Sequence, residues 1–128
     1  MASVILDTSA IIALLNDEPG ADLVDAHMSD ARISAINFQE VITILLRQGI
    51  PMDAALDLLD TLRLDIMPHG HKDATTAAAL YPATRIYGSG LGDRSCMALG
   101  IALSLPVLTA DQAWARLDIA GLEVMLIR

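Results

Sequence analysis

The sequence predicts an α/β fold, with residues 1–128 forming a single domain around a mostly parallel sheet of about five strands with helices on both faces. Three observations support this fold class. Short apolar runs without polar alternation are typical of strands that are buried on both faces. These runs alternate with segments whose apolar residues recur at helical spacing. The length of 128 residues, of which 54% are hydrophobic, suits one domain with a buried core.

The N-terminal part contains two predicted strands and two predicted helices. Residues 3–7 are predicted to form a strand because Val, Ile and Leu follow one another directly. A Thr-Ser pair then begins a helix over 10–15, which ends before the Pro-Gly turn at 19–20. A second helix is predicted over 21–28, and a short strand over 32–34.

The middle of the chain is predicted to form a helical hairpin followed by a strand. A helix over 37–47 is indicated by apolar residues at positions 38, 41, 42, 45 and 46. Pro51 opens a second helix, whose apolar positions extend to residue 62, and a tight Gly-Ile-Pro link joins the two helices. Residues 64–67 form the next predicted strand.

The C-terminal part continues the alternation of helices and strands and contains a glycine-rich loop at 87–92. Its predicted elements are helices at 73–81, 93–103 and 111–117, and strands at 107–109 and 123–127. Trp114 lies at helical spacing from other apolar residues, and no residue near Cys96 in the sequence would activate its thiol. Both side chains are therefore predicted to pack in the core.

Charge and composition exclude several classes of function. Sixteen acidic residues against eight basic ones give a net charge of −8, the wrong sign for a protein that binds nucleic acid through a basic surface. A polyanionic ligand would therefore require divalent cations or a basic partner. The longest charge-free stretch, residues 95–110, is shorter than the ~20 residues of a membrane span. A start without basic residues predicts no secretory signal, and the lone Cys96 fits a cytoplasmic location.

Four acidic residues lie where strands end or helices begin. Asp7 directly follows the apolar run Val4–Leu6, and Asp111 comes two residues after the strand at 107–109. Asp93 begins a helix, and Glu40 lies in the first turn of its helix. In a parallel α/β sheet, ligands bind at the carboxyl ends of the strands. We therefore expect these four carboxylates to meet at one edge of the sheet and to form an acidic metal site.

Each of these acids also has a purely structural interpretation. Asp93 and Asp111 are favoured residue types for helix N-caps. Glu40 follows Asn37 at the spacing of a capping box, so its side chain would reach back to the start of its own helix. Asp7 would stabilise the N-terminus of the helix that it precedes. Spacing alone leaves both interpretations open.

A family resemblance favours the metal site. The four motifs of PIN-domain nucleases resemble residues 4–15 (VILDTSAIIALL), 34–40 (SAINFQE), 92–100 (GDRSCMALG) and 105–114 (LPVLTADQAW), in that order. The order, the spacing and the chain length are similar to those of VapC-type toxins, the ribonuclease components of toxin–antitoxin pairs. The resemblance covers nearly the whole chain and implies a PIN-like domain.

The resemblance implies a catalytic site and its cofactor. Asp7, Glu40, Asp93 and Asp111 would hold Mg²⁺ or Mn²⁺, and the chain would hydrolyse RNA phosphodiester bonds with a metal-activated water. Carboxylate oxygens are the ligands that such hard cations prefer, whereas Cys or His ligands would have indicated zinc. Hydroxyl groups near the metal would come from three further residues, Thr8, Ser9 and Thr109.

The resemblance also implies partners. A cognate antitoxin, similar to VapB, would occupy the acidic cleft, and a basic segment would suit the charge of −8. The apolar helical surface between Val41 and Leu62 would be its docking groove, unless those residues form internal core. The chain would act as a homodimer on RNA, with no membrane association. Arg85 and Arg94, which flank the glycine loop, are candidates for phosphate contacts, and solvated surface arginines are the alternative.

Two other functions remain open at this point. A catalytically inactive PIN-like binding module would keep the fold without the chemistry, and the presence of all four acids argues against it. A phosphohydrolase or phospho-receiver with an acidic pocket would use an aspartate, often with a lysine partner. The one lysine of the chain, Lys72, lies in a segment that begins a helix, away from the four acidic motifs.

Overall fold

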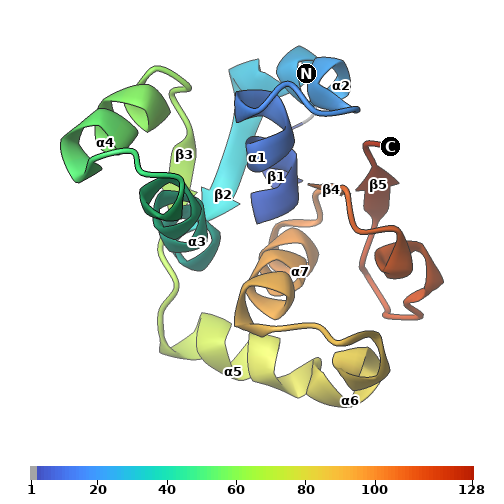
Figure 1. The fold of residues 1–128 in the computed structure, drawn as a ribbon. Coiled ribbons are helices and arrows are strands. Elements are labelled where there is room, and N and C mark those ends of the chain that lie inside the picture. Colours follow the sequence, from blue (N-terminus) through green and yellow to red (C-terminus); the bar gives the residue numbers. More distant parts are fainter. Residues whose placement is uncertain (1–2) are drawn as a thin grey trace.

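In the computed structural model, which describes residues 3–128, helices alternate with five strands along the chain (Figure 1). The strands are β1 (Val4–Leu6), β2 (Ala31–Ser34), β3 (Asp65–Met67), β4 (Val107–Thr109) and β5 (Val124–Leu126). The α-helices are α1 (Thr8–Leu15), α2 (Ala21–Ala26), α3 (Ala35–Arg47), α4 (Met52–Asp60), α5 (His71–Ala79), α6 (Tyr81–Thr84) and α7 (Leu91–Leu103). Short 3₁₀ turns are η1 (Met28–Asp30), η2 (Arg85–Tyr87) and η3 (Gln112–Arg116). Residues 1–2 lie outside the described residues, and so does the part of the secretory-signal prediction that concerns them.

The five strands form one parallel sheet in the order β3-β2-β1-β4-β5. The chain therefore builds one half of the sheet outward from β1 and then crosses to the other side of β1 to add β4 and β5. A reversal of this kind opens a crevice at the carboxyl ends of the two central strands. In this chain the crevice lies beyond Leu6 and Thr109, where β1 and β4 end.

Helices cover both faces of the sheet, as predicted. Val4 and Leu6 of β1 belong to a buried cluster that is packed by α1, α2, α3 and α4. Ile5, between them, points to the opposite face and packs with Cys96 of α7 and Trp114 of η3. Because successive strand residues alternate between faces, a continuous apolar strand requires a layer of helices on each side. The predicted α/β class is confirmed, and so is the burial of Cys96 and Trp114.

Two helices begin earlier than predicted, for the same physical reason. The helices expected to start at Asp73 and Asp93 start at His71 and Leu91. Asp73 accepts a hydrogen bond from the backbone N–H of Gly70, and Asp93 accepts one from Gly90, each at 2.9 Å. Each aspartate therefore lies within the first turn and reaches back to a glycine that precedes the helix, rather than being the N-cap itself.

The helix that carries Glu40 also begins earlier than predicted. Its N-cap is Ser34, whose hydroxyl accepts a hydrogen bond from the backbone N–H of Ile36 at 3.1 Å. Glu40 therefore lies in the second turn of α3, not in the first, and the interpretation of Asn37 and Glu40 as a capping box is wrong.

The glycine-rich loop is also shorter than predicted, because η2 extends through Tyr87.

Within residues 3–128, no helix combines the length and the apolar character needed to cross a lipid bilayer.

Candidate functional site

The four acidic residues singled out in the sequence line one cleft. Asp7 follows β1, Asp111 follows β4, Glu40 projects from α3 and Asp93 from the first turn of α7. The cleft has a volume of about 310 Å³. Its wall also includes Thr8, Ser9, Ile12, Glu18, Ile44 and Arg128. The structure therefore brings together residues that lie more than 100 positions apart, because β1 and β4 are neighbours in the sheet (Figure 1).

Asp7 lies at the bottom of the cleft and is 4% exposed. Its Oδ2 accepts hydrogen bonds from the hydroxyls of Ser9 at 2.7 Å and Thr109 at 2.9 Å. Ser9 in turn accepts a hydrogen bond from the backbone N–H of Ala110, and Thr109 accepts one from that of Asp111. These two hydroxyls fix the Asp7 carboxylate and join the start of α1 to the end of β4.

Burial raises the pKa of Asp7 to about 6, because desolvation disfavours the charged form. The hydrogen bonds from Ser9 and Thr109 offset only part of this effect, and the nearby charge of Asp93 adds to it. The pKa of Asp93 is also raised, again chiefly by burial, with the charge of Asp111 as a further cause. A cation in the cleft would reverse both effects by favouring the ionised carboxylates.

Glu40 lies at the rim of the cleft and contacts two other elements. Its Oε1 accepts hydrogen bonds from the hydroxyl of Thr8 at 2.8 Å and from Nδ2 of Asn37 at 3.2 Å. The Glu40 carboxylate also lies against Gly92 of α7, and a Cβ at Gly92 would collide with it. A side chain at position 92 would therefore displace the Glu40 carboxylate from its present place, so glycine preserves this close approach.

Asn37 is a site residue that the sequence analysis missed. It is fully buried, and its Nδ2 contacts Thr8 Oγ1 at 3.0 Å, Glu40 Oε1 at 3.2 Å and the carbonyl oxygen of Gly92 at 3.1 Å. A signal existed in the sequence, because residues three apart lie on the same face of a helix. The capping-box interpretation used that spacing for the wrong contact.

Asp93 and Asp111 cap their helical segments and also line the cleft. Asp93 accepts the hydrogen bond from Gly90, and Oδ1 of Asp111 accepts one from the backbone N–H of Ala113 at 3.0 Å. The N-cap prediction is confirmed for Asp111 and wrong for Asp93, which lies in the third position of α7 and bonds back to the N-cap Gly90. Each cap uses one oxygen of the carboxylate, so capping and ligand binding are compatible.

The two arginines predicted to contact RNA are not among the residues that line the cleft. Arg94 donates from Nη1 to the carbonyl of Ser89 at 2.7 Å, and its guanidinium lies 5.5 Å from the ring centroid of Tyr81. It faces a neighbouring cavity of about 380 Å³, while Arg85 is exposed on η2. In the cleft, the basic lining residue of the described chain is Arg128, which is bonded to Glu18 at 3.1 Å.

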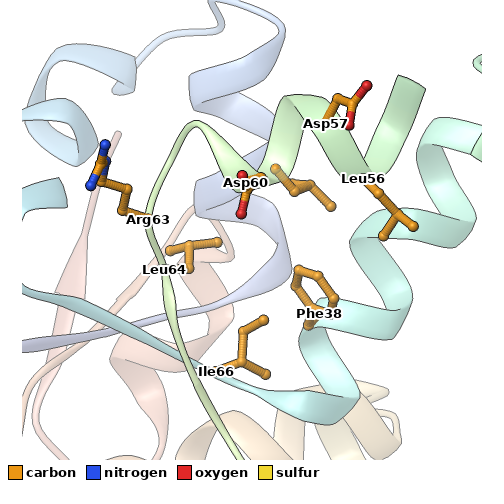
Figure 2. Close-up of a pocket in the computed structure, with 8 residues that line it drawn as sticks. Phe38, Leu56, Asp57, Asp60, Arg63, Leu64 and Ile66 are labelled. Carbon is orange, nitrogen blue, oxygen red and sulfur yellow. The ribbon is translucent and has the colours of Figure 1, made fainter. Parts of the chain in front are cut away.

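The apolar segment between Val41 and Leu62 is partly core and partly surface. Val41 and Leu45 of α3 and Ala55 and Leu59 of α4 are buried, so the facing sides of the helical hairpin form internal core. A separate pocket lies between α3, α4 and β3 (Figure 2), and its volume is about 320 Å³. Phe38, Leu56, Leu64 and Ile66 give this pocket apolar walls, and Asp57, Asp60 and Arg63 lie around it.

The donors in the acidic cleft fit a hard divalent cation in their chemistry. Every titratable lining residue other than Arg128 is a carboxylate, and hard cations prefer such oxygen ligands. Within residues 3–128, however, no three His, Cys, Asp or Glu side chains have the spacing of a preassembled metal site. The fit therefore rests on two features, the carboxylate donors and the buried Asp7, whose charge no neighbouring cation among the described residues balances. Binding an ion would require these carboxylates to move closer together.

A model of the PIN domain family matches residues 4–120 of this chain. The chain belongs to the PIN-domain family. This PIN domain is 30% identical to a protein named ribonuclease VapC from Mycolicibacterium smegmatis, over 93% of this chain and 99% of the relative. It is also 30% identical to ribonuclease VapC30 of Mycobacterium tuberculosis, over 91% of this chain and 95% of the relative.

Solved structures share the fold of this PIN domain. DNA-bound VapBC from Salmonella typhimurium aligns over 100% of both chains with a TM-score of 0.74 and 18% identity. VapBC2 from Rickettsia felis, bound to a fragment of promoter DNA, aligns over 96% of this chain and 97% of the other, with a TM-score of 0.74 and 17% identity. At this level of identity the likeness shows that the PIN domain has the same fold as these chains.

Proposed function

We propose that this PIN domain is a metal-dependent endoribonuclease and acts as the toxin of a type II toxin–antitoxin pair. The observation that carries the proposal is the convergence of Asp7, Glu40, Asp93 and Asp111 on one cleft. The relatives named VapC ribonucleases, which align over more than nine tenths of this chain, support the same activity.

The proposed cofactor is Mg²⁺ or Mn²⁺, held by Asp7, Glu40, Asp93 and Asp111. When bound, such an ion lowers the pKa of a coordinated water and stabilises the charge that develops on the phosphate oxygens. Asp7 contributes a carboxylate whose orientation is already fixed by Ser9 and Thr109. These hydroxyls, together with Thr8 at Glu40, support the acids and keep them oriented for an ion.

The proposed substrate is RNA, and the site must reduce the repulsion between RNA and a chain of net charge −8. Neutralising the acids of the cleft with a cation removes the charge nearest to the phosphate. Arg94 of α7 and Arg85 of η2 are proposed to contact RNA phosphates outside the cleft. The Arg94 guanidinium is held in place by Ser89 and Tyr81, so little side-chain entropy is lost on binding.

The proposed partners are a VapB-like antitoxin and a second copy of the chain. A basic antitoxin segment in the cleft would place arginines beside several carboxylates, and Arg–carboxylate hydrogen bonds are charge-assisted and often bidentate. The solved structures that share this fold are named as VapBC complexes, which supports an antitoxin partner for this chain.

An RNA cleavage assay tests this proposal. The purified chain is incubated with labelled RNA in Mn²⁺, in Mg²⁺ and in EDTA, beside an Asp7→Asn variant. We expect cleavage by the wild type with either metal, and none in EDTA or by the variant. If the wild type binds RNA but leaves it intact with both metals, the chain is a binding module and the proposal is wrong.

A phosphohydrolase remains the alternative enzyme, and the structure gives it little support. Lys72, the lysine that such a site would employ, is exposed on α5 and is not among the residues that line the cleft. The same preparations can be assayed for release of phosphate from a small phosphomonoester. Turnover of that substrate without RNA cleavage would favour the alternative.

A further inference from the structure

We propose that Asn37 is a positioning residue, whose buried amide holds Glu40 and the first turn of α7 in the arrangement that binds the metal. This inference rests on the proposed function and deepens it. Asn37 is 0% exposed, so it does not line the cleft and acts through the residues that it contacts.

The direction of each hydrogen bond around Asn37 is fixed by chemistry. The Gly92 carbonyl can only accept, so the amide nitrogen of Asn37 must face it. Thr8 donates its single hydroxyl hydrogen to Glu40 Oε1, so its oxygen accepts from Asn37. Two N–H groups therefore serve three acceptors, and hydrogen bonds from both Asn37 and Thr8 end on Oε1 of Glu40.

This network leaves the other carboxylate oxygen of Glu40 available. Within residues 3–128, no side chain or backbone group donates a hydrogen bond to Oε2. With Oε1 held by two donors, the carboxylate has one orientation in the cleft wall, and Oε2 is the oxygen left for a cation. Asn37 also joins α3 to Gly92, the residue directly before Asp93, and so ties the positions of two acids together.

The two ends of the Asn37 amide are used unequally. Its Oδ1 is buried and has no hydrogen-bond partner among the described residues. An unpaired buried carbonyl lowers stability. The role of the Asn37 side chain is therefore to donate from Nδ2 to its three acceptors, of which Thr8 and Glu40 line the cleft.

The test compares Asn37→Asp with the wild type. The substitution keeps the shape of the side chain and replaces the N–H donors with a carboxylate oxygen, which repels Glu40 Oε1 and the Gly92 carbonyl. Losing a partner that orients a metal ligand typically costs about 10–100-fold in metal affinity or activity. We expect kcat for RNA cleavage to fall by about 10-fold or more with KM within about 2-fold, because RNA contacts lie elsewhere. The Mn²⁺ concentration at the midpoint of the rise in Tm should increase by a similar factor.

Ser34→Ala is the matched control. Ser34 is 2% exposed, caps α3, and is hydrogen-bonded to Ser95 of α7, so it also ties α3 to α7. It makes no hydrogen bond to the four acids. We expect Ser34→Ala to lower Tm in EDTA while leaving kcat and the Mn²⁺ midpoint unchanged. Asn37→Ser, which retains one donor on a shorter side chain, replaces Asn37→Asp if the latter fails to fold.

Each outcome decides the inference. It is wrong if kcat and the Mn²⁺ midpoint of Asn37→Asp stay within about 2-fold of the wild type, or if Ser34→Ala lowers both equally. If the wild type cleaves no RNA, the proposed function fails, and the Mn²⁺ midpoint alone decides the role of Asn37. A wild type with no Mn²⁺ response overturns the inference, since Asn37 would then have no ligand site to position.

Discussion

Replacing Asp7 with asparagine should stabilise the metal-free protein at neutral pH. The pKa of Asp7 is about 6 in the folded chain against 3.8 for an unperturbed aspartate. Folding therefore favours the protonated form of Asp7. At neutral pH, where Asp7 is ionised, the free energy of unfolding is lower than it would be with a neutral side chain. One pKa unit corresponds to about 1.4 kcal/mol, so the cost of this ionisation reaches about 3 kcal/mol above pH 6. The asparagine side chain would avoid this cost, and its amide oxygen can still accept from Ser9 and Thr109.

The pH dependence identifies the cause. A group with a raised folded pKa contributes stability that is fully present below pH 3.8 and is lost as the pH rises through about 6. The advantage of Asp7→Asn over the wild type should therefore be absent near pH 3.8 and complete above pH 6. For a chain of 128 residues, 3 kcal/mol corresponds to an upper limit of roughly 10 °C in Tm.

The assay is thermal unfolding in EDTA at several pH values between 4 and 7.5. Asp118→Asn, at an exposed position, is the control for a general effect of removing one negative charge. Mn²⁺ at a thousand times its dissociation constant should reverse the order, since it adds about 4.1 kcal/mol to the wild type alone. The reasoning is refuted if Asp7→Asn is no more stable than the wild type at pH 7.5 in EDTA, or if its advantage is equal at pH 4.

Three further predictions follow from the site and the core. Gly92→Ala should reduce RNA cleavage by about 10-fold or more, because the added Cβ displaces the Glu40 carboxylate. The change in Tm should be small, and unchanged cleavage kinetics would contradict this prediction. The thiol of Cys96 should resist alkylation in the native protein, since burial raises its pKa, and rapid labelling before unfolding would show that α7 opens. Arg94→Ala should raise KM for RNA and leave the Mn²⁺ midpoint unchanged, and an equal KM would exclude Arg94 from the RNA surface.

The sequence was sufficient for the five strands, for most of the helices and for the class of fold, because these depend on local patterns. Val4, Ile5 and Leu6 follow one another without a polar residue, and a strand of this kind needs cover on both faces. The starts of α5 and α7 were missed because an aspartate in the third helical position and an aspartate at the N-cap look alike in sequence. Only the backbone N–H that each carboxylate binds distinguishes them.

From the order of residues alone, Asp7 and Asp111 follow strands, Asp93 lies at a helix start and Glu40 lies near one, which predicts that the four acids share the carboxyl edge of a parallel sheet. How they are held at that edge depends on contacts between distant parts of the chain. Asp7 owes its raised pKa to burial, which outweighs the hydrogen bonds from Ser9 and Thr109, and Glu40 owes its orientation to Asn37 and to the missing Cβ of Gly92. These contacts join residues up to 102 positions apart. Local sequence patterns do not predict these contacts, because the contacts form only when β4 packs beside β1 and α7 packs against α3.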